Sequence, residues 1–226
     1  MISPKFASTH YYHSARTLAS GKSFTPHVVN LYLDYNCPFS AKLFLKLKPQ
    51  VIPQLQELHP NKFQFVFVNV VQPWHTNSNL LHEFSLVVAK LLRGNLEKDI
   101  DSNTLFWDVS EVLFENKELF YDTANVNLNR NEIYQQISDL VFEKLSLPFS
   151  KDDVLKELTI QSETEKEKQS NSGNGATVDL KYFTKYLRNV GVHVTPTISI
   201  NNIVNDSVSS GDEIENLIKT FESQLE

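Results

Sequence analysis

The sequence predicts an α/β fold in which a mixed central sheet is flanked by helices and carries an inserted helical region. A strand-like run, HVVNLYLDY (27–35), leads directly into a helix that begins at Pro38. A second apolar run, KFQFVFVNVV (62–71), follows that helix. Such a βαβ unit crosses over right-handedly and sets its two strands parallel. Amphipathic patterns at 77–93, 104–116 and 131–146 predict the inserted helices.

The second strand is apolar on both faces, with Phe63, Phe65 and Phe67 on one and Val66, Val68 and Val70 on the other. This pattern predicts a central strand covered by helices on each side. In the helix that precedes it, Pro49 and Pro53 predict a kink or a division into two helices.

The chain divides into four parts. Residues 1–26 form an N-terminal extension that could add an edge strand through Phe6, His10, Tyr11 and Tyr12. Residues 27–75 and 177–226 form the α/β core, which ends in a helix at 177–190, a hairpin with strands around VHVTPTISINN and 203–208, and an amphipathic helix. Residues 76–161 form the helical insertion. Residues 162–176 are predicted to be a mobile loop, because their charged, serine and glycine residues cannot support burial.

Composition narrows the classes of partner. The 226 residues carry 21 basic and 27 acidic side chains, a net charge of −6, so neither nucleic acid nor an anionic membrane is expected as a partner. A single cysteine favours a reducing compartment, and we expect a cytoplasmic protein. The alternative is mitochondrial, because residues 1–33 include Lys5, Arg16 and Lys22 and no acidic residue.

Cys37 is the residue best suited to redox chemistry. It lies at the turn between the first strand and the first core helix, where unpaired backbone N–H groups and the helix dipole favour a thiolate. A lone cysteine is often only a small buried apolar residue. Its position inside a βαβ unit favours the chemical role instead, and we predict Cys37 to be catalytic.

Three pieces of sequence together resemble the DsbA-like branch of the thioredoxin superfamily. They are LYLDYNCPFSAKL around Cys37, QPWH followed by LLHEFSLVVAKL, and VTPTISIN near the C-terminus. The resemblance covers residues 27–221 and implies a thioredoxin fold with an inserted helical domain. It also implies that Pro196 is cis and faces the cysteine, and that Thr195 offers backbone groups to a bound peptide or thiol.

Ser40 stands where dithiol members of that branch have a second cysteine, which excludes disulfide donation by an internal cysteine pair. We predict monothiol chemistry, in which Cys37 attacks a mixed disulfide and an outside thiol such as glutathione completes the turnover. Ser40 is the second predicted catalytic residue, as a hydrogen-bond donor to sulfur. No covalently bound cofactor is expected.

Two alternatives stay open. Kappa-class glutathione transferases share this architecture and use a serine at the first position of the motif to orient glutathione, so Cys37 could contact a bound glutathione. A non-catalytic module could instead hold a peptide, glutathione or a protein partner in the groove beside Pro196. The oligomeric state is left open.

Trp74 and His75 follow the second strand at the end where ligands gather in open α/β sheets. The competing interpretation is a packed tryptophan and a histidine at a helix start. The complete set of predicted substrate-binding residues is Pro38, Phe39, Trp74, His75, Val194, Thr195 and Pro196.

Two other polar positions receive structural interpretations. Asp34 could be a buried acid, but a cap for the following helix is the favoured interpretation. No metal site is predicted, because His82 and Glu83 lack a second histidine four residues later. Cys-x-x-Ser also resembles the motif of monothiol glutaredoxins, and this resemblance suggests an iron-sulfur cluster held between two subunits with glutathione as co-ligand. Pro38 stands where those motifs usually have glycine, which disfavours this hypothesis.

Overall fold

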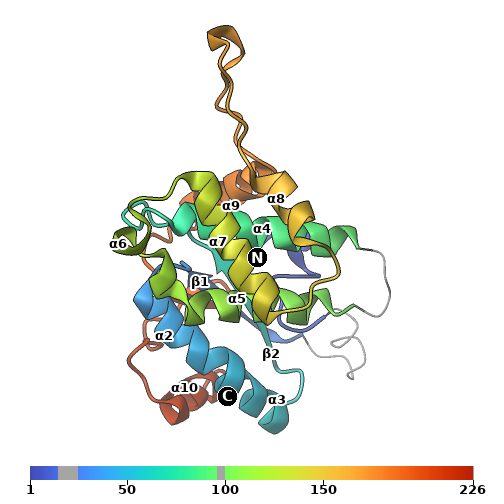
Figure 1. Ribbon diagram of the computed structural model, residues 1–226. Helices are drawn as coiled ribbons and strands as arrows, with labels where there is room; N and C mark the ends of the chain where they lie inside the picture. The colour runs from blue at the N-terminus through green and yellow to red at the C-terminus, as the bar shows by residue number, and fades with distance from the viewer. Residues whose placement is uncertain (15–24, 96–99, 226) are drawn as a thin grey trace.

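The computed structural model describes residues 1–14, 25–95 and 100–225. Arg16 and Lys22, which contribute to the mitochondrial interpretation, lie outside these residues. The chain forms a four-stranded sheet in the order β2-β1-β3-β4 (Figure 1). The strands are β1 (His27–Leu33), β2 (Phe63–Asn69), β3 (Thr197–Ile200) and β4 (Ile203–Val204).

The sheet is mixed, as the sequence predicts. β1 and β2 are parallel, and their register runs from His27 opposite Phe63 to Leu33 opposite Asn69. β3 is antiparallel to both β1 and β4. β4 is shorter than the predicted 203–208, because pairing with β3 stops after two residues.

The helix after Cys37 is divided in two. α2 (Pro38–Lys46) and α3 (Ile52–Leu58) are joined by a π-helical segment, Leu47–Val51, which contains Pro49. Pro53 lies in the first turn of α3, where a missing backbone N–H costs no helical bond. The two prolines therefore produce the predicted division without a turn between the helices.

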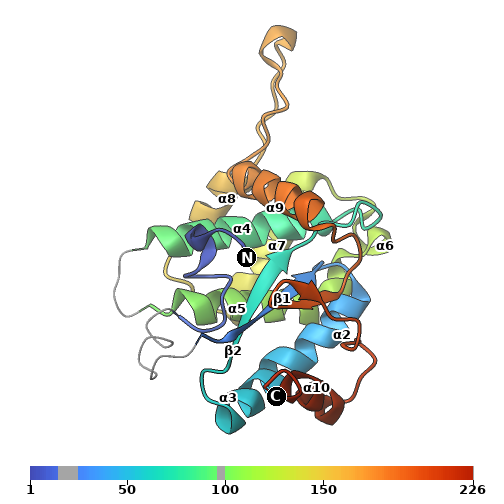
Figure 2. The same ribbon diagram turned by 180° about the vertical axis from the view of Figure 1, so that it is seen from behind.

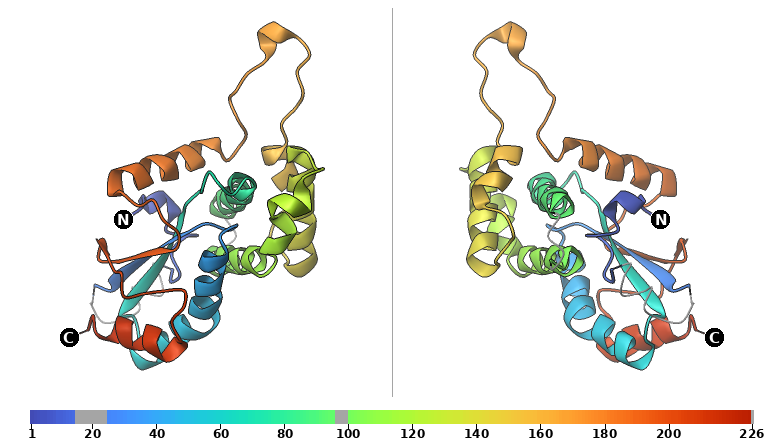
Figure 3. Two further views of the ribbon diagram at one scale, coloured as in Figure 1. Left: turned by 90° about the vertical axis from the view of Figure 1, so that its left-hand side faces the viewer. Right: turned by 90° about the vertical axis from the view of Figure 1, so that its right-hand side faces the viewer.

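The remaining helices surround the sheet. They are α4 (Ser78–Gly94), α5 (Ser102–Glu115), α6 (Asp122–Asn125), α7 (Arg130–Lys144), α8 (Lys151–Leu158), α9 (Thr177–Val190) and α10 (Ile214–Glu222). Short 3-10 turns cover Pro4–Phe6, Lys117–Phe120 and Lys166–Lys168. The segment between α8 and α9, predicted to be mobile, projects away from the rest of the chain (Figures 1 and 3). In Figure 2, α9 and α10 lie at opposite ends of the sheet.

One hydrophobic core joins the sheet and the inserted helices. The ring of Phe67 on β2 contacts Phe44 of α2 and Trp107 of α5. Phe65 meets Phe221 of α10 instead, with ring centroids 5.3 Å apart. The phenylalanine face of β2 thus binds the insertion and the C-terminal helix to the same strand.

β2 is the edge strand of the sheet, so the prediction of a central strand is wrong. Its seven residues are nevertheless all buried, because the N-terminal extension covers the outer edge. Tyr12 N–H donates to the carbonyl of Phe65, and Phe67 N–H donates to the carbonyl of His10. This contact is a single β-bridge between Tyr11 and Val66 rather than a strand. No helix among the described residues is long and apolar enough to cross a membrane.

His10 lies entirely inside this contact. Its Nε2 is 2.9 Å from Oδ1 of Asn69, and its ring stacks on Phe106 at 4.3 Å. Burial, only partly offset by the Asn69 hydrogen bond, lowers the pKa of His10 to about 3. The folded protein therefore holds a neutral imidazole where the unfolded chain binds a proton below pH 6.5.

We expect the free energy of unfolding to fall as the pH drops from 6.5 toward 3, because only the unfolded state protonates His10 in this window. At pH 4.5 the loss from this group is on the order of 3 kcal/mol. Urea unfolding at pH 7.0 and 4.5 measures this loss of unfolding free energy in the native protein and in the His10→Gln variant. The variant should lose less stability between the two pH values. Equal losses in the two proteins would contradict the assignment.

Candidate active site

Cys37 is the N-cap residue of α2, and no side chain caps this helix end. Its backbone N–H donates to the carbonyl of Asp34 at 3.0 Å, and its carbonyl accepts the Ala41 N–H. Pro38 occupies the first helical position. The sulfur therefore lies at the positive end of the α2 dipole.

The sulfur faces the loop before β3. Sγ of Cys37 donates to the carbonyl oxygen of Thr195 at 3.5 Å, and the Thr195–Pro196 peptide bond is cis, as the resemblance implies. The cysteine is only 4 % exposed. The sulfur is therefore nearly enclosed, with the Thr195 carbonyl as its hydrogen-bond acceptor.

Gln72 holds the same loop from the other side. Its Nε2 donates to the carbonyl of His193 at 3.0 Å and to Oγ1 of Thr195 at 3.2 Å. Oγ1 of Thr197 donates to the carbonyl of Val194 at 2.7 Å. The loop opposite the sulfur is thus fixed by side chains from β3 and from the segment after β2.

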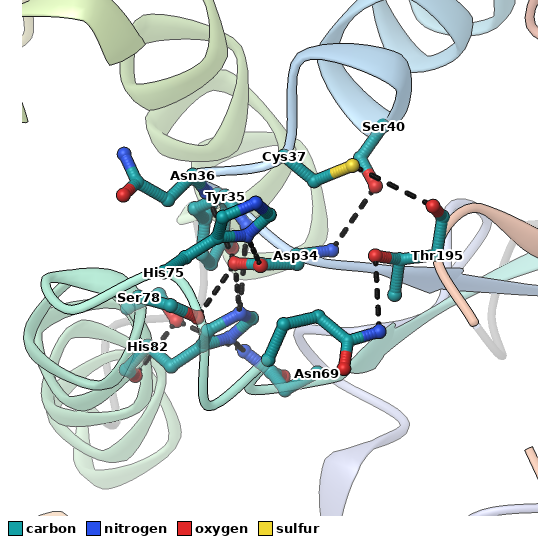
Figure 4. A network of polar contacts seen from close by, with 12 residues as sticks. Asp34, Tyr35, Asn36, Cys37, Ser40, Asn69, His75, Ser78, His82 and Thr195 are labelled. Carbon is teal, nitrogen blue, oxygen red and sulfur yellow. Dashed lines mark hydrogen bonds and ion pairs between the residues drawn. The ribbon is translucent and has the colours of Figure 1, made fainter. Parts of the chain in front are cut away.

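Asp34, at the end of β1, is the centre of a buried polar network (Figure 4). Its Oδ2 lies 2.5 Å from Nδ1 of His75. Its Oδ1 accepts hydrogen bonds from the Ser78 hydroxyl at 2.6 Å and from the Asn36 N–H at 3.0 Å. The interpretation of Asp34 as a cap of α2 is wrong, because its acceptors are used by these groups.

His82 extends the network into the core. Its Nε2 is 3.5 Å from Oδ1 of Asp34, and its Nδ1 is 2.9 Å from Nδ2 of Asn69. Asn69 in turn contacts His10. Glu83 points elsewhere, to Arg130 and Tyr134. The adjacent histidine and glutamate therefore do not converge, and the described residues contain no cluster able to hold a metal ion.

The network keeps Asp34 ionised. Burial alone would raise the pKa of this carboxyl, but hydrogen bonds and charge from His82, with further hydrogen bonds from His75 and Ser78, outweigh it. The resulting pKa lies below the ordinary value. An anion is thus held three residues before the cysteine.

Ser40 is fully buried and turned toward β1. Its Oγ accepts the Asp34 N–H at 3.2 Å. No hydrogen bond from Ser40 to the Cys37 sulfur is present among the described residues. Ser40, which stands where dithiol relatives have the second cysteine, therefore supports the backbone of the segment that carries Asp34.

Most apolar residues of the predicted substrate-binding set are exposed. Phe39, Trp74 and Val194 are 61 %, 63 % and 66 % exposed. Pro38 is exposed as well, and Pro196 is half-buried. Exposed aromatic and aliphatic groups beside a reactive atom suit contact with a ligand.

Gln72, Ser78 and His82 belong to this site in addition to the residues predicted from the sequence. Gln72 could have been found from its place in QPWH, directly after β2. Ser78 and His82 lie on one face of a helix start, and that spacing was the available signal.

Comparisons with known proteins agree with this geometry. The profile of a thioredoxin family matches residues 13–220. A search of curated protein sequences finds no match. Among solved structures, a proposed protein-disulfide isomerase from Pseudomonas syringae has a TM-score of 0.61 at 22% identity, over 86% of this chain and 93% of its own.

Two further structures cover nearly the whole chain. BdbD from Bacillus subtilis has a TM-score of 0.60 at 21% identity, over 99% of this chain and 96% of its own. MdbA, a thiol-disulfide oxidoreductase from Corynebacterium diphtheriae, has a TM-score of 0.54 at 14% identity, over 96% and 99%. These likenesses establish the fold.

We expect Asp34→Asn to lower the free energy of unfolding at pH 7 by about 1–3 kcal/mol, because the buried donors lose a charged acceptor. The pKa of Asp34 is depressed in the folded state, so its contribution is present above the unfolded pKa and is lost as the pH falls through the folded value. Urea unfolding of the native protein and the variant at pH 7 and pH 3 measures the difference in their free energies of unfolding, which should be smaller at pH 3. Asp152→Asn, an exposed change on α8, is the control. A pH-independent difference would contradict the ionised state.

Proposed function

The chain belongs to the thioredoxin family and has the fold of its DsbA-like members, and from that premise we propose that it is a monothiol thiol-disulfide oxidoreductase acting through Cys37. The observation that carries the proposal is the position of the sulfur. It lies at the N-terminus of α2 and against the carbonyl of Thr195, before a cis proline. A disulfide laid along that loop would present a sulfur atom to the thiolate.

The reaction has two exchange steps. The Cys37 thiolate attacks the glutathione sulfur of a mixed disulfide; a bond from Cys37 to that sulfur forms, and the substrate leaves as a thiolate that takes up a proton. A second glutathione, as thiolate, then attacks this sulfur and releases glutathione disulfide and the Cys37 thiolate. Overall, the mixed disulfide and one glutathione thiol are converted to the free substrate thiol and glutathione disulfide, so one disulfide bond is broken and one is formed.

The outside thiol is required because the chain has one cysteine. Ser40 cannot form a disulfide, and its hydroxyl supports Asp34 instead. Glutathione is the proposed second substrate on chemical grounds, as the abundant small thiol of a reducing compartment.

His75 is the proposed acid for the leaving thiolate. Asp34 holds its Nδ1, which leaves Nε2 as the nitrogen that can meet a ligand. None of the described residues hydrogen-bonds to Nε2, and the side chain is 23% exposed. Figure 4 shows His75 and Cys37 flanking Asp34 at the end of β1. The arrangement resembles the carboxylate-histidine pairs that transfer protons in other enzymes.

A second candidate is a binding module without catalysis. The exposure of Phe39, Trp74 and Val194 around a nearly buried sulfur favours it. Such a module would hold a peptide beside Pro196 by main-chain pairing and apolar contact.

We expect Cys37→Ser to abolish turnover of a glutathione mixed disulfide, because it removes the only nucleophilic sulfur. The assay couples glutathione disulfide formation to glutathione reductase and NADPH. Alkylation of the native protein should have the same effect. Turnover that persists in the variant would refute the proposal. A native rate equal to the uncatalysed rate would favour the binding module.

We expect His75→Gln to slow release of an alkyl thiol by about 100-fold, the low end of general acid contributions. With thionitrobenzoate as the leaving group the defect should nearly disappear, because this stable thiolate needs no proton. Stopped-flow single turnovers with the two mixed disulfides measure the ratio. Equal rate reductions for the two leaving groups would show that His75 positions the site and does not donate a proton to the leaving thiolate. His59→Gln, a surface histidine paired with Glu222, is the control.

A further inference from the structure

The outer face of α9 carries a row of cations. Lys181, Lys185 and Arg188 are spaced four and three residues apart, so they lie on one side of the helix. All three are exposed. Within the described part of the chain, none of them has an ion-pair partner, although the whole protein carries a net charge of −6.

Two adjoining hollows follow this face. The first, of about 420 Å³, is lined by the three cations together with Asn79 and Thr177. The second, of about 330 Å³, is lined by Gln72, Trp74, Leu187 and His193, among others. Leu180, Thr184 and Arg188 line both. We call the combined surface the α9 groove.

Acidic side chains do not neutralise the groove. Among the described residues, Glu83 is the only acidic one that lines either hollow, and both its carboxylate oxygens accept hydrogen bonds from Arg130. Tyr134 donates to the same carboxylate. The positive charges of Lys181, Lys185 and Arg188 are therefore available to a ligand.

The groove is linked to the loop that faces the Cys37 sulfur. Trp74 and His193 line its second hollow. Gln72 joins His193 to Thr195, whose carbonyl contacts the Cys37 sulfur. A chain that presents a disulfide at Cys37 could continue past Trp74 into the groove.

We propose that the α9 groove binds an acidic segment of a polypeptide substrate, next to the substrate cysteine that carries glutathione; this rests on the proposed function. At 1.5 Å per residue, Lys181 and Lys185 are about 6 Å apart along the helix. Alternate residues of an extended peptide are about 6.6 Å apart. Glutamates at every second position therefore match the spacing of Lys181 and Lys185.

Binding is tested apart from the reaction. Fluorescein-labelled peptides of eight residues without cysteine, with Glu, Gln or Lys at alternate positions, are titrated into the Cys37→Ser protein and followed by anisotropy. We expect the Glu peptide to bind at least ten-fold more tightly than the Gln peptide, with the preference lost at high salt. Lys181→Gln/Lys185→Gln should abolish the preference. Lys144→Gln/Lys219→Gln, the same charge change at exposed positions on α7 and α10, should keep it.

Equal binding of the Glu and Gln peptides would overturn the proposal. An equal loss in both double variants would also overturn it, because net charge rather than the groove would then be responsible. Neither result bears on turnover of the glutathione mixed disulfide by native protein. The peptide titration thus tests the groove proposal, and the turnover assay tests the oxidoreductase proposal separately.

Discussion

The buried carboxylate of Asp34 is the contact on which the arrangement of the site depends. It joins the turn before Cys37, through the Asn36 N–H, to the start of α4, through Ser78. An ionised group without water is tolerated only when donors surround it. Its burial therefore holds the end of β1, the cysteine turn and the first turn of α4 as one unit. Hydrogen bonds to a charge are directional, whereas apolar packing is not, so this carboxylate defines where His75 lies relative to the sulfur.

The serine of the cysteine motif belongs to the same unit. Its hydroxyl oxygen accepts the Asp34 N–H from inside the core. A thiol is a weak acceptor, so sulfur at this position would satisfy that N–H less well. The change from a second thiol to Ser40 removes the internal thiol that would resolve a mixed disulfide, and it strengthens the support of the carboxylate. The motif is thus consistent with a site that keeps its geometry while depending on an outside thiol.

Local patterns in the sequence are sufficient to predict the helices and strands, but they are not sufficient to predict the contacts between them. Alternating Phe63, Phe65 and Phe67 predict a strand buried on both faces, and β2 is one. Its place at the sheet edge was missed, because the backbone that covers this edge belongs to the N-terminal extension. The cap interpretation of Asp34 is wrong for a related reason: the side chains that contact its carboxylate are distant in the sequence. Its partners His75 and Ser78 follow 41 and 44 residues later, and no local rule connects them.

The two faces of α9 have separate electrostatic roles. On the inner face, buried Asp179 is paired with Arg93 of α4 at 2.7 Å and with Lys5 of the N-terminal extension. These ion pairs fix the helix against the rest of the fold. The cations of the outer face are consequently presented at a constant spacing, set by the helix and not by a loop. The backbone under these charges needs no ordering on binding, so the entropy cost is confined to the side chains. Selection among ligands would then depend on whether their carboxylates match that spacing.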